Sequence, residues 1–153
     1  MNVEIRQATI ADIDIVVDYN ARLAEETENM RLDRERLRRG VTTILGDRSK
    51  GLYFLAEIGG KTVGQISVTF EWSDWRNGNF WWLQSVYIEE AYRGRGILKQ
   101  LFNYLMALPE VNTSVRGLRL YVEKSNESAS AAYRRLGFEP AHYDMMELGF
   151  KTN

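Results

Sequence analysis

One segment constrains the fold more than any other: the run Arg93-Gly94-Arg95-Gly96-Ile97-Leu98 joins two stretches of different periodicity. Residues 80–88, before it, have the aromatic and β-branched content of a strand, and the residues after it repeat apolar side chains at helical spacing. Two glycines in such a turn leave N–H groups open at the start of a helix, where the dipole favours an anion. The turn therefore predicts an α/β architecture and a phosphate site, with a purely steric need for glycine as the alternative.

The common nucleotide motifs do not fit this turn. A mononucleotide P-loop has Lys and then Ser or Thr directly after its last glycine, whereas Ile97 and Leu98 follow Gly96 here. A dinucleotide fingerprint has a third glycine where this chain has Lys99. The phosphate site, with Arg93 and Arg95 adding positive charge, is thus expected to serve another ligand.

Composition limits the class of protein. With 153 residues, we expect one domain, 1–153, that buries a real core. Twenty Lys and Arg against 21 Asp and Glu give a formal net charge of -1, which favours neither nucleic acid nor an acidic membrane as a partner. No cysteine and a single histidine disfavour disulfides, thiolate nucleophiles and a metal site. Without an apolar leader or a membrane-length apolar run, the expected location is cytoplasmic.

Local patterns predict a mixed α/β (α+β) chain. A capping-box variant from Thr9 to Asp12 opens a first helix, Asp33 caps a second, Gly96 opens a third, and Ser125 or Asn126 caps a fourth. Gly59-Gly60 is typical of a two-residue hairpin loop. The strands are expected at 3–7, 52–58, 61–71, 80–88, 118–123 and 143–150.

The chain resembles the GNAT superfamily of acyl-CoA-dependent N-acetyltransferases over nearly its whole length. The phosphate signature of that family falls on Arg93, Gly96 and Leu98. A second family mark falls on Asn126, Tyr133 and the run Leu136-Gly137-Phe138. The resemblance implies a mixed, mostly antiparallel sheet of six to seven strands flanked by about four helices. It also implies acetyl-CoA as co-substrate, without a metal.

Within this superfamily, the chain is most similar in pattern to the diamine (spermidine/spermine) acetyltransferase branch. The segments that carry it are Glu71-Trp72-Ser73-Asp74-Trp75 and Leu83-Gln84-Ser85-Val86-Tyr87-Ile88. Two residues depart from the branch pattern. Leu98 replaces a small residue, so its side chain must turn away from the pyrophosphate, and Gln84 replaces the glutamate that would be the general base.

The resemblance assigns roles to backbone and side chains. The acetyl-CoA site comprises the pyrophosphate loop, the pantetheine-binding strand end, and two residues of the last helix. An N–H of Val86 or Tyr87 is expected to favour the oxyanion. Tyr133 is the expected general acid for the thiolate, and a core tyrosine is the alternative. The residues of the expected cofactor site are Val86, Tyr87, Ile88, Arg93, Gly94, Arg95, Gly96, Ile97, Leu98, Asn126 and Tyr133.

The general base is left open by the sequence. Gln84 cannot accept the proton of an ammonium group, although its amide can position a water molecule. Glu71 and Asp74 are the first candidates because four tryptophans surround them, and aromatic faces together with carboxylates favour a cation. Glu26 and Glu28 are further candidates, and solvated surface charge is the alternative for each. The expected acceptor-binding residues are Glu26, Trp72, Trp75 and Gln84.

The expected function is transfer of an acetyl group from acetyl-CoA to a primary amine of a small molecule. Acetylation of a protein N-terminus or lysine is the first alternative. A degenerate acyl-CoA sensor is the second, because of the departures at Gln84 and Leu98. A homodimer is common among similar proteins and is possible here. The basic run 31–39 contains Asp33 and Glu35, which favours a solvated helix face over a nucleic-acid patch.

Overall fold

The computed structural model describes residues 1–151. Two compact units make up the chain, residues 1–123 and residues 124–153. The first unit contains the sheet and most of the helices, and the second contains the last helix and the C-terminal segment.

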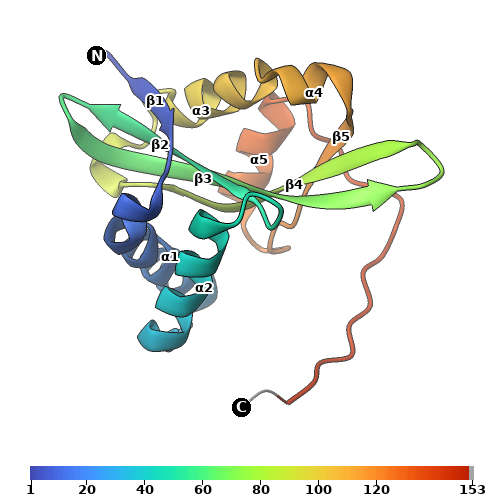
Figure 1. The fold of residues 1–153 in the computed structure, drawn as a ribbon, viewed down its shortest axis with the longest axis horizontal. Helices are drawn as coiled ribbons and strands as arrows, with labels where there is room; N and C mark the ends of the chain where they lie inside the picture. Colours follow the sequence, from blue (N-terminus) through green and yellow to red (C-terminus); the bar gives the residue numbers. More distant parts are fainter. Residues whose placement is uncertain (152–153) are drawn as a thin grey trace. The chain divides into compact units, whose positions relative to one another are not determined.

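The first unit is built on a five-stranded sheet (Figure 1). Its strands lie in the order β1-β2-β3-β4-β5. The pairs β1–β2, β2–β3 and β3–β4 are antiparallel, and β5 is parallel to β4, as the helix between them allows. The expected six to seven strands are therefore corrected to five. The strands are β1 (Glu4–Gln7), β2 (Leu52–Ile58), β3 (Lys61–Ser73), β4 (Gly78–Ile88) and β5 (Val115–Leu120).

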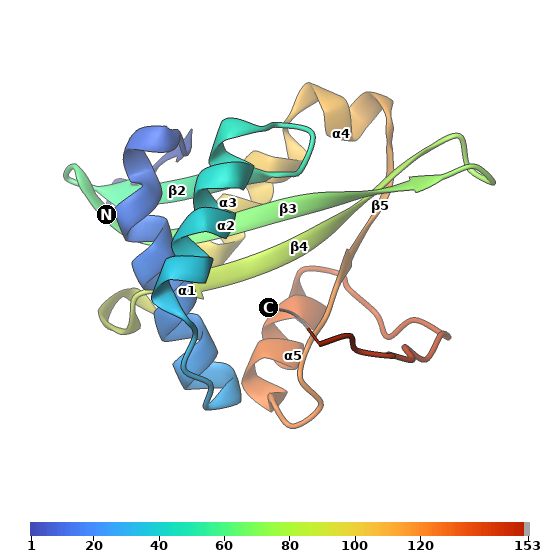
Figure 2. The same ribbon diagram turned by 60° about the horizontal axis from the view of Figure 1, so that its bottom comes forward.

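Helices cover both faces of this sheet. In Figures 1 and 2, α1 (Ile13–Glu28) and α2 (Arg34–Gly46) lie on one face, and α3 (Ile97–Met106) lies on the other. Alternation along β2 explains this, because Tyr53 and Leu55 belong to the core under α1 and α2, whereas the Phe54 ring contacts Tyr104 of α3. Short helices η1 (Ile10–Asp12), η2 (Glu90–Tyr92) and α4 (Pro109–Thr113) complete the unit. Across residues 1–151, every helix is too short or too polar to cross a bilayer.

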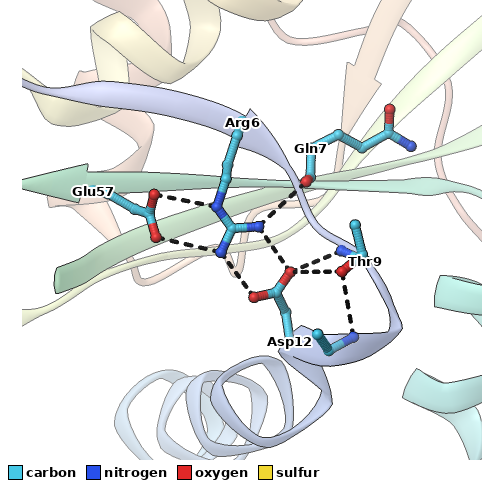
Figure 3. A network of polar contacts seen from close by, with 6 residues as sticks. Arg6, Gln7, Thr9, Asp12 and Glu57 are labelled. Carbon is cyan, nitrogen blue, oxygen red and sulfur yellow. Dashed lines mark hydrogen bonds and ion pairs between the residues drawn. The ribbon is translucent and has the colours of Figure 1, made fainter. Parts of the chain in front are cut away.

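A polar network at the start of the chain ties β1 to the first helical turn (Figure 3). The Arg6 guanidinium donates to both carboxylate oxygens of Asp12, at 2.9 and 2.8 Å, and its Nε donates to Glu57 at 3.1 Å. Asp12 also accepts from the N–H of Thr9 at 2.8 Å, which closes the expected capping box. Hydrogen bonding and charge from Arg6 hold the pKa of Asp12 below its ordinary value of 3.8.

In the second unit, α5 (Glu127–Arg135) begins where expected: Asn126 accepts a hydrogen bond from the N–H of Ala129 at 3.1 Å. The expected strand at 143–150 was wrong, because these residues form no β-ladder. The large apolar side chains there are exposed, and Met146 is 94 % exposed. An alternating pattern forms a strand only when a partner strand pairs with it, and the pattern itself does not supply one.

Candidate active site

The glycine loop before α3 has the geometry of an anion site. Gly94 and Gly96 have φ values of 75° and 79°, a region that strains other residues. A Cβ at either position would meet no atom within 4 Å, so the conformation and not crowding requires glycine. Gly96 is the N-cap of α3 and no side chain caps the helix. Among residues 1–151, no hydrogen bond engages the N–H groups of residues 94–99, so they remain available to a ligand.

The two arginines of the loop point to neighbouring groups. Arg93 donates from Nε to the carbonyl of Ile88 at 2.8 Å and from Nη2 to Glu26 at 3.0 Å. The Arg95 guanidinium lies 5.4 Å from the ring centre of Tyr92. Arg93 therefore fixes the loop to β4 and α1, and the Glu26 carboxylate neutralises its charge. The charge of Arg95 has no carboxylate partner among the described residues.

A β-bulge interrupts β4 beside its pairing with β3. The register passes from Gln65 opposite Tyr87 to Ser67 opposite Gln84, so Ser85 and Val86 together face the single residue Ile66. Ser85 has a φ of 49°, a left-handed conformation that is uncommon outside glycine. The bulge turns the backbone of β4 just before the strand end that the sequence predicts for the pantetheine arm.

The same part of β4 is open on its other side. The parallel ladder with β5 ends at Leu83 opposite Leu120, so within the described chain residues 84–88 have a ladder partner only in β3. Backbone N–H and C=O groups on such an edge can pair with an extended ligand. The expected pantetheine strand therefore has no partner strand on this edge among the described residues, although the Ile88 carbonyl accepts a hydrogen bond from Arg93.

An acidic hollow of about 550 Å³ lies next to the end of β4. Tyr87, whose side chain is on the α1 face, contributes its ring, which lies 5.0 Å from that of Tyr19. Burial raises the pKa of Glu26, but hydrogen bonds from Tyr87 and Arg93 outweigh burial and bring this pKa below its ordinary value. The Glu26 carboxylate is therefore ionised at neutral pH. The lining residues of the hollow are Arg22, Glu25, Glu26, Tyr87, Glu89, Glu90 and Ala91.

Glu71, a candidate base, is held by two donors. The Trp82 indole donates to its Oε1 at 2.7 Å, and Arg119 forms an ion pair with it at 3.2 Å. The Trp82 ring also stacks on Tyr121 with ring centres 4.5 Å apart. Gln84 lies on the same face, where its Nε2 donates to Thr69 at 3.3 Å. Of the two adjacent tryptophans, Trp81 is in the core at 4 % exposure, as strand alternation predicts.

Other candidates lie at the far end of β4, on the hairpin that projects in Figure 1. Asp74 accepts from the N–H of Trp75 in the turn, and Trp75 is 89 % exposed. The stretch from Asn79 to Tyr87 spans roughly 26 Å at about 3.3 Å per residue. The structure therefore separates Trp72, Asp74 and Trp75 from the acidic hollow that contains Glu26.

Tyr133 lies on α5 in the second unit. Its ring meets that of Phe138 edge to face at 5.9 Å, and Gly137, with a φ of 103°, closes the helix between them. Burial raises the pKa of the Tyr133 phenol. The group is therefore protonated at neutral pH, which is the state that a general acid needs.

Comparison with known proteins identifies the family. The model of the acetyltransferase (GNAT) family matches residues 15–138, which include the glycine loop, the bulge and Tyr133. This chain belongs to the GNAT acetyltransferase family. Membership places it among the acyltransferases and confirms the broad resemblance seen in the sequence. The narrower likeness to the diamine branch is not confirmed.

Individual relatives agree with this assignment. A possible acetyltransferase from Clostridium difficile 630 has a solved structure with a TM-score of 0.91 and 43 % identity, covering 99 % of this chain and 100 % of that one. A mycothiol acetyltransferase from Corynebacterium efficiens is 38 % identical over 87 residues, or 50 % of this chain. An uncharacterized N-acetyltransferase from Methanocaldococcus jannaschii is 25 % identical over 88 % of this chain. The chain spans 29 % and 60 % of the lengths of these last two proteins.

The fold also matches a more distant structure. A predicted acetyltransferase with acetyl-CoA from Clostridium acetobutylicum has a TM-score of 0.78 at 18 % identity, covering 97 % of this chain and 96 % of that one. At this identity the likeness concerns the fold.

Sequence reasoning missed several residues of this candidate site. Gln65 and Ser67 contact the bulge from β3, and Glu89 and Glu90 line the acidic hollow. The sequence signal for Gln65 and Ser67 was weak, because it consists only of two polar residues, two positions apart, in the otherwise apolar run 63–68. Buried polar side chains in a central strand need hydrogen-bond partners, which could have drawn attention to them.

Proposed function

We propose that this GNAT chain, acting as one catalytic domain over residues 1–153, transfers the acetyl group of acetyl-CoA to a primary amine of a small molecule. The observation that carries the proposal is the open N-terminus of α3, with left-handed glycines and unengaged N–H groups, next to the free edge of β4. The helix N-terminus suits an anion, and the strand edge suits an extended amide chain. A ligand that carries both groups in one molecule would bind to both features at once.

Coenzyme A would bind with its diphosphate on the N–H groups from Gly94 to Leu98, because the N–H of Arg93 already donates to the carbonyl of Glu90. Leu98 is half-buried, and its side chain would have to turn away from the diphosphate. The pantetheine arm would lie along residues 86–88 like an added strand, and Asn126 and Tyr133 of α5 would complete the site. Arg95 would add charge attraction, while Arg93 holds the loop in place through Glu26.

The acidic hollow is the proposed acceptor site. A primary alkyl amine has a pKa near ~10.4 and arrives as a cation at neutral pH, which carboxylates attract. Four glutamates line the hollow, and two of them already pair with a cation: Glu26 with Arg93 and Glu89 with Lys61. Glu25 and Glu90 add two further carboxylates, while the lining guanidinium of Arg22 pairs with Asp18. The polarity of this lining favours a small cationic amine over a neutral acceptor, and diamines are accordingly the first class to test.

The reaction would proceed by direct attack. The amine nitrogen forms a bond to the thioester carbon, and the carbonyl electron pair moves to oxygen, where the N–H of Val86 or Tyr87 favours the negative charge. On collapse the C–S bond breaks, and Tyr133 gives its proton to the departing thiolate. The nitrogen loses one proton to form the neutral amide, and Tyr133 recovers a proton from solvent.

Removal of the proton from the incoming ammonium needs a base before attack. Gln84 sits between the hollow and Glu71 on the α1 face, and its Nε2 bond to Thr69 leaves its carbonyl oxygen free to hold a water molecule. Such a water can pass the proton to solvent. Glu71 and Asp74 stay candidates, although Arg119 and Trp82 occupy Glu71.

Free-thiol release from acetyl-CoA tests the proposal directly. The panel contains diamines and polyamines, amino acids, aminoglycosides, and peptides with free N-termini or lysines. Turnover with a small cationic amine is expected. Turnover with peptides alone would support protein acetylation instead, and tight acetyl-CoA binding without thiol release for any amine would support a sensor.

A further inference from the structure

Two buried polar side chains of β3 hold the bulge of β4. Ser67 Oγ donates to the carbonyl of Gln84 at 2.8 Å, and Gln65 Nε2 donates to the carbonyl of Ser85 at 2.9 Å. Gln65 is 0 % exposed and Ser67 is 1 % exposed. Ser85 lies in the bulge and Gln84 is the ladder residue next to it, so the two side chains bind the backbone of β4 at the point where its register shifts.

The bond from Gln65 sets the direction of the next N–H group. The peptide between Ser85 and Val86 is trans and planar, so its carbonyl and its N–H point in opposite directions. Because the side chain of Gln65 holds the Ser85 carbonyl, the N–H of Val86 points away from the Gln65 amide. On the side of β4 away from β3, the edge beyond Leu83 has no ladder partner among the described residues.

Stability of the fold does not explain why Gln65 and Ser67 hold the bulge. Ser85 is held at a φ of 49°, which costs energy for a residue with a side chain. The other polar atom of the same amide, Gln65 Oε1, is the buried side-chain atom without a hydrogen-bond partner among the described residues. A half-satisfied buried amide gives little net stability, and such groups in native structures often have a functional role.

We propose that Gln65, supported by Ser67, is a positioning residue that aims the Val86 N–H at the oxyanion of the acetyl-transfer reaction. This inference rests on the proposed function. It deepens that function because it names the side chain that orients the backbone donor. Neither residue contacts the substrate in this account, since both act through the backbone of β4.

Turnover measurements on four variants test the proposal. Gln65→Leu and Ser67→Ala remove a donor, whereas Ser67→Thr keeps the hydroxyl and is expected to restore activity. Val68→Ala is the control: Val68 is equally buried on the same strand but faces α3, so this variant loses packing without touching the bulge. We expect kcat to fall about 10- to 100-fold in Gln65→Leu, less than removal of an oxyanion donor itself, with the KM for acetyl-CoA changed by less than about threefold.

A second readout does not require turnover. In protein labelled with ¹⁵N-valine, the Val86 amide resonance should shift in Gln65→Leu and keep its position in Val68→Ala. Wild-type kcat in Gln65→Leu, an equal loss of kcat in Val68→Ala, or an unmoved Val86 resonance would each overturn the inference. If wild-type protein releases no thiol with any amine, the proposed function fails, and the resonance still decides whether Gln65 orients Val86.

Discussion

Arg93 Nη2 lies 3.0 Å from Glu26 Oε1 and links the glycine loop to the acidic hollow. The Arg93 guanidinium also lies 5.4 Å from the ring centre of Tyr87, which lines the same hollow. The proposed coenzyme site and the proposed acceptor site therefore share one ion pair. A change in either partner is expected to affect both sites to different degrees.

Glu26→Gln should raise the KM for a cationic amine by about 5- to 10-fold. The variant removes one negative charge from the hollow, and the positive charge of Arg93, no longer paired, offsets the charge of a second carboxylate. The KM for acetyl-CoA should change less, since the loop N–H groups persist. Steady-state kinetics with each substrate varied in turn measure both effects. Glu25→Gln is the matched control, as Glu25 lines the hollow without pairing to Arg93. An acetyl-CoA effect larger than the amine effect would place the acceptor elsewhere.

Gly96→Ala should weaken acetyl-CoA binding by about 10-fold or more. Alanine at a φ of 79° costs on the order of 1 kcal/mol and tends to rotate the N–H groups that face the diphosphate. Gly60→Ala is the control, because Gly60 has the same φ in the β2–β3 hairpin and also faces open space. Both variants should lose similar stability by thermal unfolding. Equal acetyl-CoA affinity in the two would argue against the loop as the phosphate site.

Tyr133→Phe should lower kcat by about 100-fold or more while leaving acetyl-CoA affinity nearly unchanged, because it removes the proton-donating hydroxyl and keeps the ring. Tyr143→Phe, at an exposed tyrosine of the same unit, should have wild-type kinetics. Single-turnover thiol release gives the rate of the chemical step. A Tyr133→Phe enzyme with full activity would remove this residue from the mechanism.

Glu71→Gln and Asp74→Asn, assayed separately, locate the base. Because Glu71 is ion-paired and Asp74 lies at the hairpin tip, we expect kcat to fall less than about threefold in each, with proton loss passing to solvent through water. A fall of 100-fold or more in either variant would identify that carboxylate as the base.

Asp12→Asn should reduce the free energy of unfolding at pH 7 by about 1 to 2 kcal/mol, since it weakens charge-assisted hydrogen bonds from Arg6 and the cap on Thr9. The folded-state pKa of Asp12 is depressed below 3.8, so its contribution is present above that value and disappears as pH falls through the folded pKa. Urea unfolding from pH 7 to pH 2.5 should show the two proteins converging at acid pH. Asp14→Asn, at a mostly exposed ion pair, should cost less, and a difference independent of pH would contradict the assignment.

The sequence predicted the features that depend on neighbouring residues. Thr9, Asp33 and Asn126 cap helices where expected, and the Gly59-Gly60 turn joins β2 to β3. These features follow from hydrogen bonds and dihedral angles within a few residues. The glycine loop was predicted for the same reason.

Features that depend on distant residues were missed or wrong. The bulge at Ser85 relies on Gln65, 20 positions earlier, and the anchor of Arg93 is Glu26, 67 positions earlier. The strand expected at 143–150 needed a partner that no local pattern can specify. Separation of Asp74 and Trp75 from the hollow likewise follows from the length of the β3–β4 hairpin and not from their proximity in sequence.

The central claim is that the N–H groups from Gly94 to Leu98 hold the diphosphate of coenzyme A. The most direct measurement is titration of acetyl-CoA into ¹⁵N-labelled protein, with calorimetry on the same sample. We expect one binding site and the largest amide shifts at Gly94, Arg95, Gly96 and Ile97. Absence of binding heat, or shifts centred on other residues, would contradict it.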